Sequence, residues 1–325
     1  MEVRGKKERA FTIFGKRIIL FLSEKENDRK HHDGSSPARR RVQTCILRGD
    51  IVCPRMPIWN EWLQNSHPRP SVRHQNFVLG GGIVLIQIQN FTKRYGDRDV
   101  VKNISFTAKD GVITGFIGHN GAGKSTTIKA ITGVIRPTSG TITVNGYDVV
   151  KDALQAKYQF GYVSDSPDHF LRLTGVEYLH FIADIYDTPA DGRAEFIEKN
   201  AKRFGIYDAL NNQILSYSHG MRQKIMIMGA LIHDPSVWIL DEPLTGLDPQ
   251  SAFELKKMMR EHAEKGNSVF FSTHVLEVAE KLCDEICIIK QGELLYTGTL
   301  EGLKATYKSQ ASLENIFLEL TDITE

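Results

Sequence analysis

The nine residues GHNGAGKST, Gly118–Thr126, restrict the fold of this 325-residue chain more than any other stretch. They satisfy the pattern G-x-x-x-x-G-K-[ST], in which glycines let backbone N–H groups close around a phosphate. The hydrophobic segment GVITGFIG runs into the loop, and KSTTIKAITGV continues from it with a helical pattern. A strand, a glycine turn and a helix whose positive end faces the turn together predict a nucleotide-binding loop.

All nine loop residues are candidate contacts of the nucleotide. We expect Lys124 to reach the β- and γ-phosphates and the Ser125 hydroxyl to ligate Mg²⁺. The alternative is a glycine turn without a ligand, and the strand before the motif and the helix after it argue against this alternative. The candidate nucleotide-binding residues of the loop are Gly118, His119, Asn120, Gly121, Ala122, Gly123, Lys124, Ser125 and Thr126.

A second stretch, SVWILDEPLTGLDP, places acidic residues at the end of a buried strand. Asp241 at the carboxyl end of the apolar run can hold Mg²⁺ through its water shell. The neighbouring Glu242 can polarise a water in line with the γ-phosphate. The segment STH closes the next strand and puts His274 at the γ-phosphate edge. The candidate catalytic residues are therefore Glu242, His274 and Lys124, and the candidate metal ligands are Asp241 and Ser125.

Strand and helix patterns alternate from Ile83 onward, where IVLIQIQNF reads as the first strand. Further strands are expected near residues 141–144, 160–163, 237–241, 268–272, 285–290 and 293–297. Helices are expected near residues 124–133, 174–186, 190–204, 219–232, 249–265, 275–282 and 312–320. This alternation indicates an α/β core with a largely parallel sheet.

The order of five motifs resembles that of the ATP-binding cassette (ABC) ATPases. The motifs are the phosphate loop, YSHGMRQK (Tyr217–Lys224), LDEP, GLDP and STH, and the resemblance covers about residues 83–320. Their joint occurrence is highly specific. It implies an α/β fold with a phosphate-loop NTPase core, a mainly parallel sheet, an antiparallel β subdomain and a helical signature subdomain at about residues 165–232.

The resemblance also implies a sandwich dimer of two cassettes, alike or different. Ser218 and Gly220 of one protomer would then complete the ATP site that the phosphate loop of the second protomer holds. This explains why one chain has two helix starts suited to anions, with Lys124 and Ser218 94 positions apart. Asp248 in GLDP matches the loop that crosses to the second protomer. A serine that only caps its own helix is the alternative, and it explains less.

Single positions match further roles in the family, and two depart from its pattern. Tyr95 in KRYGDRDVV matches the aromatic residue that stacks on adenine. The segment Tyr217–Met221 matches the family's signature motif, in which His219 stands where glycine is usual. Asp165 stands where glutamine is usual. Because a carboxylate is a better ligand for a hard cation than an amide, Asp165 remains a candidate Mg²⁺ ligand and catalytic residue. Asp165 lies in GYVSDSPDHF (Gly161–Phe170), which matches the family's loop to the membrane partner, and we expect it to alter the metal affinity and the coupling to that partner.

The resemblance predicts the ATP-hydrolysing subunit of an ABC transporter, which powers a separate membrane permease. The C-terminal SLENIFLELT is similar to the ending of bacterial exporter subunits and indicates export. One alternative is a soluble ABC ATPase acting on nucleic acid or ribosomes, and another is a regulatory protein that hydrolyses ATP weakly. Residues 83–325 hold 25 Lys and Arg against 31 Asp and Glu, a balance that argues against a nucleic-acid partner.

Composition and cysteine spacing bear on where the protein works. No stretch of the sequence reaches the roughly 18 apolar residues of a membrane-spanning helix. The four cysteines form no CxxC pair and have no histidines at zinc spacing. These features predict a reduced, cytoplasmic protein. On the resemblance, it lies on the inner face of the cell membrane, contacts the membrane only through its permease, and uses ATP and Mg²⁺.

Residues 1–82 differ from the rest in charge and pattern. They hold 16 Lys and Arg against 8 Asp and Glu, and segments such as HHDGSSPARRR are polar and broken by Pro and Gly. We expect either a disordered basic tail or a mis-assigned start, because LGGGIVLIQIQ would be encoded by GGN codons shortly before a non-AUG start. The ABC domain is thus expected at residues 83–320, with a short tail at 321–325.

Overall fold

The computed structural model describes residues 8–14, 17–23, 45–46, 78–79, 82–307 and 312–322. The chain divides into two compact units, Met1–Arg69 and Pro70–Glu325. In the first unit, β1 (Glu8–Phe14) pairs antiparallel with β2 (Arg17–Ser23), which also pairs with β3 (Cys45–Ile46). Most of residues 1–82 lies outside the described residues, so the disordered or mis-assigned extension stays a prediction. Residues 323–325 of the predicted tail also lie outside them.

A six-stranded sheet forms the centre of the second unit. Its order is β10 (Phe160–Val163), β11 (Val237–Leu240), β12 (Ser268–Thr273), β7 (Ile113–Ile117), β13 (Glu285–Lys290) and β14 (Glu293–Thr299). The first five strands are parallel and β14 is antiparallel to β13. Every residue of β7, β11 and β12 is buried, as expected for strands covered on both faces. Parallel strands share one carboxyl edge, so the segments that follow β7, β11 and β12 meet there.

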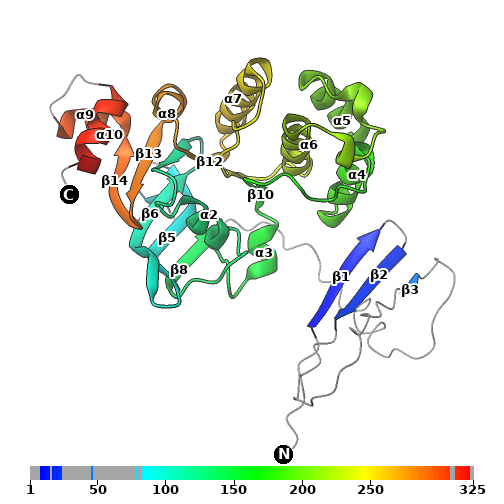
Figure 1. The fold of residues 1–325 in the computed structure, drawn as a ribbon, viewed down its shortest axis with the longest axis horizontal. Helices are drawn as coiled ribbons and strands as arrows, with labels where there is room; N and C mark the ends of the chain where they lie inside the picture. Colours follow the sequence, from blue (N-terminus) through cyan, green and yellow to red (C-terminus); the bar gives the residue numbers. More distant parts are fainter. Residues whose placement is uncertain are drawn as a thin grey trace, which may run out of the picture. The chain divides into compact units, whose positions relative to one another are not determined.

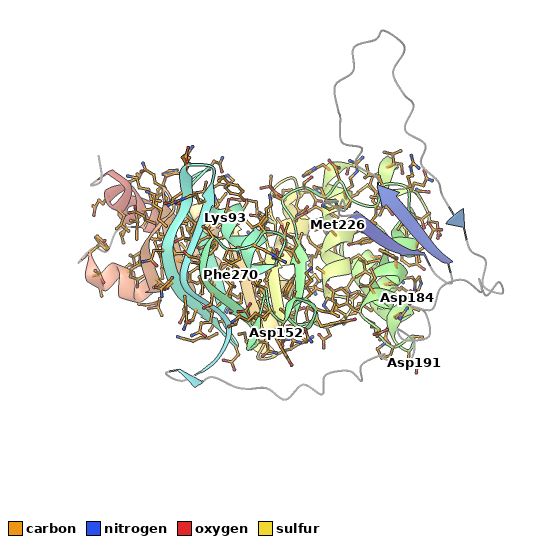
Figure 2. All side chains as sticks on the ribbon, turned by 90° about the horizontal axis from the view of Figure 1, so that it is seen from below. Lys93, Asp152, Asp184, Asp191, Met226 and Phe270 are labelled. Atoms are coloured by element: carbon orange, nitrogen blue, oxygen red, sulfur yellow. The ribbon has the colours of Figure 1, made fainter. Side chains whose placement is uncertain are left out.

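A second, antiparallel sheet packs on the first. It contains β4 (Val78–Leu79), β5 (Gly82–Tyr95), β6 (Arg98–Lys109), β8 (Ser139–Val144) and β9 (Tyr147–Asp148). The rings of Phe106, Phe116 and Phe270 lie within 5.5 to 5.7 Å of one another and join the two sheets. Phe270 is labelled in Figure 2. Helices α2 (Lys124–Ile131) and α3 (Ala153–Lys157) belong to the same part of the unit.

The segment between β10 and β11 is helical. It contains α4 (Gly175–Ile185), α5 (Arg193–Arg203) and α6 (His219–Leu231), which Figure 1 shows grouped apart from the antiparallel sheet. Helix α4 begins with a capping box in which Thr174 and Glu177 satisfy each other's backbone N–H groups. Gly229 of α6 faces the Tyr178 side chain, and an added Cβ atom would lie 2.6 Å from the Tyr178 hydroxyl oxygen, so α4 and α6 pack closely.

The remaining helices lie on the face of the central sheet opposite to the antiparallel sheet. They are α7 (Pro249–Glu264), α8 (Leu276–Leu282), α9 (Leu300–Thr306) and α10 (Leu313–Asp322). The long predicted helices and the predicted strands lie within a few residues of their expected positions. Within residues 83–320, sequence periodicity missed β6, β9, α3 and α9, three of which are seven residues or shorter. Among the described residues, no helix is both long enough and apolar enough to cross a bilayer.

Candidate nucleotide site

The phosphate loop connects the buried strand β7 to helix α2. A Cβ atom added at Gly118 would lie 2.4 Å from the backbone oxygen of Ile289, so only glycine fits there. Gly123 has φ of +112°, in the region that favours glycine, and precedes the first residue of α2. No side chain caps α2, and its first N–H groups therefore stay directed at the loop. This is the geometry of an anion-binding helix start.

Lys124 directs its ammonium group into this loop. Its side chain is 6% exposed, and Nζ donates to the backbone oxygens of Gly118 at 2.7 Å and His119 at 3.3 Å. Nζ also lies 3.2 Å from Oε1 of Glu242, an ion pair without hydrogen-bond alignment. The lysine therefore brings a cation to the meeting point of the phosphate loop and the acidic strand end.

Asp241 directly follows β11 and is fully buried. Its Oδ1 accepts a hydrogen bond of 2.6 Å from the Ser272 hydroxyl, and Oδ2 has no hydrogen-bond partner among the described residues. Burial raises the pKa of Asp241, the hydroxyls of Ser272 and Ser125 oppose this shift, and the charges of Asp165 and Glu242 add to it. A buried carboxylate with a spare oxygen, a nearby serine and a second carboxylate fits a hard divalent cation.

Glu242 follows in a left-handed backbone conformation, with φ of +49°. Its N–H donates to the Ser272 hydroxyl at 2.9 Å, so one hydroxyl holds both acidic residues in place. The turn separates the two carboxylates: Oε2 of Glu242 lies 3.0 Å from Nδ1 of His274, while Oε1 faces Lys124. The motif STH predicted His274 as a site residue, but it did not predict that the Ser272 hydroxyl near the end of β12 binds both acidic residues.

Asp165 and Tyr95 lie at the edges of this arrangement. Asp165 is exposed in the segment after β10, close enough for its charge to act on Asp241. Tyr95 ends β5 with 49% of its surface exposed, and the Lys93 ammonium lies 4.8 Å from its ring centroid. The structure brings Lys124, Asp241, Glu242 and His274 together, whereas the adenine-stacking role of Tyr95 stays a prediction.

The signature segment lies at the start of α6, which Figure 1 shows in a different part of the unit from α2. The Ser218 hydroxyl accepts a hydrogen bond of 3.3 Å from the Met221 N–H. Gly220 packs so closely on Gly246 that an added Cβ would lie 2.8 Å from its oxygen. The ring of His219 also lies against Gly246. The bulk of His219 is thus packed against its own chain.

An unpredicted contact ties the signature helix to the segment that carries Asp165. Arg222 of α6 donates from Nη1 to Asp168 at 2.5 Å and from Nη2 to the Leu215 backbone oxygen at 2.9 Å. The side chain of Arg222 is 21% exposed. Arg222 lies one turn into α6 and is part of YSHGMRQK, but the spacing of the sequence did not predict Asp168, 54 positions earlier, as its partner.

Comparison with known proteins decides the family. The family model described as "ABC transporter" matches residues 101–245. The ABC-type transporter ATP-binding protein EcsA of Bacillus subtilis is 37% identical over 238 residues, covering 73% of this chain and 96% of that protein. The chain belongs to the ABC transporter ATP-binding proteins. The linearmycin resistance ATP-binding protein LnrL of the same organism is 37% identical over 215 residues, covering 66% of this chain and 69% of LnrL.

A solved structure agrees. The ATP-binding subunit of an ABC transporter superposes on this ABC ATPase with a TM-score of 0.71 and 33% identity, covering 73% of this chain and 99% of that one. The predicted fold class, the ATPase activity and the predicted role as the ATP-binding subunit of an ABC transporter are thereby confirmed.

Proposed function

We propose that this ABC ATPase binds Mg²⁺-ATP at its phosphate loop and hydrolyses it at the ends of β11 and β12. The observation that carries the proposal is the convergence of Lys124, Asp241 and Glu242 at one sheet edge. Asp241, Ser125 and Asp165 would hold Mg²⁺, which offsets charge on the phosphates when bound. Glu242, oriented by contact with His274, would take the proton of the attacking water.

The proposed nucleotide contacts include the phosphate loop, Tyr95 and two residues at the start of α6. Helix α2 and the glycines around Lys124 would hold the phosphates through N–H groups. Tyr95 would stack on adenine. The full proposed set of nucleotide contacts is Tyr95, Gly118, His119, Asn120, Gly121, Ala122, Gly123, Lys124, Ser125, Thr126, Ser218 and Gly220.

Ser218 and Gly220 would act on the nucleotide of a second protomer. Figure 1 shows α6 and α2 in separate parts of the unit, and α6 lies against the segment that carries Asp248. Lys224 of α6 pairs with Asp248 at 2.9 Å, which holds the signature and the crossing loop as one surface. A two-fold dimer would bring this surface to the partner's phosphate loop twice.

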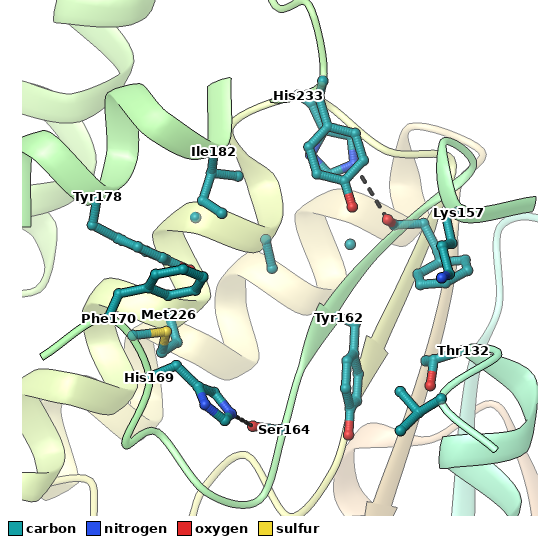
Figure 3. Close-up of a pocket in the computed structure, with 16 residues that line it drawn as sticks. Thr132, Lys157, Tyr162, Ser164, His169, Phe170, Tyr178, Ile182, Met226 and His233 are labelled. Carbon is teal, nitrogen blue, oxygen red and sulfur yellow. Dashed lines mark hydrogen bonds between the residues drawn. The ribbon is translucent and has the colours of Figure 1, made fainter. Parts of the chain in front are cut away.

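A permease would dock beside the Asp165 segment. A cavity of about 290 Å³ lies there between β10 and helices α4 and α6, and Figure 3 shows Tyr162, Phe170, Tyr178 and His233 lining it. Phe170 is 42% exposed at its edge, so an apolar side chain of a partner can be buried there. Through such a permease the protein would lie on the inner face of the cell membrane.

The proposed direction of transport is export. Support comes from the ending SLENIFLELT, which forms α10, and from the similarity to a protein described as a linearmycin resistance ATP-binding protein. The substrate is set by the permease.

Mixing two mutant chains tests the proposed composite site. Ser218→Arg puts a long cation where the partner's γ-phosphate would lie and leaves its own phosphate loop intact. The variant should bind ATP as a monomer but lose ATP-driven dimerisation and hydrolysis. Mixed with Lys124→Ala, it should form ATP-dependent mixed dimers better than either variant alone, because one of the two sites is then intact. Dimerisation and turnover of Ser218→Arg like those of the parent would show that Ser218 only caps α6.

A further inference from the structure

The C-terminal helix α10 packs against the end of β7 and the start of the phosphate loop. Its inward face buries Leu313, Ile316 and Phe317, which are 0%, 0% and 3% exposed. These side chains share one apolar cluster with Ile117 and Ala279. Ile117 is the last residue of β7 and directly precedes the first glycine of the phosphate loop. The helix therefore supports the strand end from which the loop starts.

Phe317 also contacts the loop itself. Its ring meets the His119 ring edge-on, with 5.0 Å between the centroids and an interplanar angle of 62°. The backbone oxygen of His119 accepts from the Ala122 N–H at 3.1 Å and from the Lys124 ammonium at 3.3 Å. The aromatic contact thus holds the residue whose carbonyl group orients the phosphate-binding lysine.

The same helix supports the segment after His274. Helix α8 begins two residues after this histidine, and its residues Leu276 and Ala279 belong to the cluster that α10 covers. Thr273, just before His274, is in register with Ile117 across the β12–β7 pair. One helix therefore packs behind both the phosphate loop and the strand end that carries the histidine.

We propose that α10 is a positioning element of the nucleotide site and that Phe317 is its positioning residue. This inference rests on the proposed nucleotide site. An edge-on ring pair restricts the orientation of His119. Without this ring pair the phosphate loop samples more conformations. Because ATP binding must then restrict them, the ATP affinity falls. The ending SLENIFLELT would then serve to position the phosphate loop of its own subunit.

Four variants of the full chain separate this role from plain packing. Phe317→Ala removes the ring, and His119→Ala removes its partner on the exposed loop without touching the core. Ile316→Ala is the matched control, because it opens the same cluster on the same helix and leaves the ring pair of Phe317 and His119 in place. Glu319→Ala tests the exposed face of α10. ATP affinity and KM are measured at a temperature where circular dichroism shows every variant folded.

Phe317→Ala and His119→Ala should each weaken ATP binding by about 2- to 12-fold, the range that loss of an aromatic pair gives. Only Phe317→Ala and Ile316→Ala should lower the melting temperature markedly. In the His119→Ala background, Phe317→Ala should weaken binding no further. Parental ATP affinity in Phe317→Ala, or equal weakening by Ile316→Ala, would reduce α10 to a packing element.

A Lys124→Ala chain keeps the two proposals distinguishable. If Lys124→Ala binds ATP like the parent, the proposed nucleotide site is wrong. If Lys124→Ala loses ATP binding while Phe317→Ala and His119→Ala retain the parental affinity, the site stands and the positioning role of α10 is wrong.

Discussion

Replacing Glu242 by glutamine removes the proposed base and keeps the shape of the site. In the structure its carboxylate lies between Lys124 at 3.2 Å and His274 at 3.0 Å. The amide cannot accept a proton from water, so the contribution of a general base is lost. That contribution is about 10²- to 10⁴-fold in rate, or roughly 3–5 kcal/mol on the barrier. We expect turnover to fall by at least about 10²-fold.

ATP binding should survive the same change. The ion pair between Lys124 and Glu242 competes with the phosphates for the lysine, and glutamine removes this competition. The dissociation constant for ATP should therefore be equal to or lower than that of the parent. With hydrolysis blocked, Mg²⁺-ATP should hold the protein as a dimer.

Three measurements on one preparation test this prediction. Phosphate release at saturating Mg²⁺-ATP gives the turnover, equilibrium titration gives the ATP affinity, and size-exclusion chromatography with Mg²⁺-ATP gives the assembly. Glu264→Gln is the matched control, because it removes one carboxylate from the exposed end of α7 and should leave turnover within about two-fold. Turnover of Glu242→Gln within about ten-fold of the parent would refute the assignment. A parallel loss of ATP binding would make Glu242 a binding residue instead.

Three further changes have expected outcomes. Asp165→Gln should raise the Mg²⁺ concentration needed for half-maximal ATPase activity, because an amide is the poorer ligand; an unchanged Mg²⁺ titration contradicts this. Removing residues 1–69 should leave ATPase activity and melting temperature nearly unchanged, and a drop of several degrees would show that the segment docks on the cassette. Burial lowers the pKa of His233 to about 4, so the unfolded chain takes up its proton first, near pH 6.5. Stability should fall as the pH drops from 6.5 towards 4, and His233→Gln should lessen the fall in melting temperature between pH 7 and pH 5.

The phosphate loop and the acidic strand end were predictable because their chemistry is local. Each motif fixes its residues within a few positions of one another, and parallel strands bring their ends together whatever the loops between them do. The sequence therefore predicted that four residues lie close together: Lys124, Asp241, Glu242 and His274. The long helices were equally accessible, since three or more turns give a clear apolar period.

Contacts across long stretches of sequence were not accessible in this way. The contact of Phe317 with His119 joins residues 198 positions apart, and the pair of Arg222 with Asp168 crosses 54 positions. Neither residue of either pair has a local pattern that names its partner. Strand β6 was missed although it pairs along most of β5, because its apolar residues alternate irregularly through register shifts.

The left-handed backbone at Glu242 sets two selective pressures against each other. Such a conformation costs a side-chain-bearing residue roughly 1–2 kcal/mol, and glycine adopts it freely. In a population of variants chosen only for surviving heat, glycine at this position would be enriched. In a population chosen for transport activity, glycine would be lost, because it lacks the carboxylate. The residue found at position 242 in a variant would then show which selection, for heat stability or for transport activity, acted last on that population.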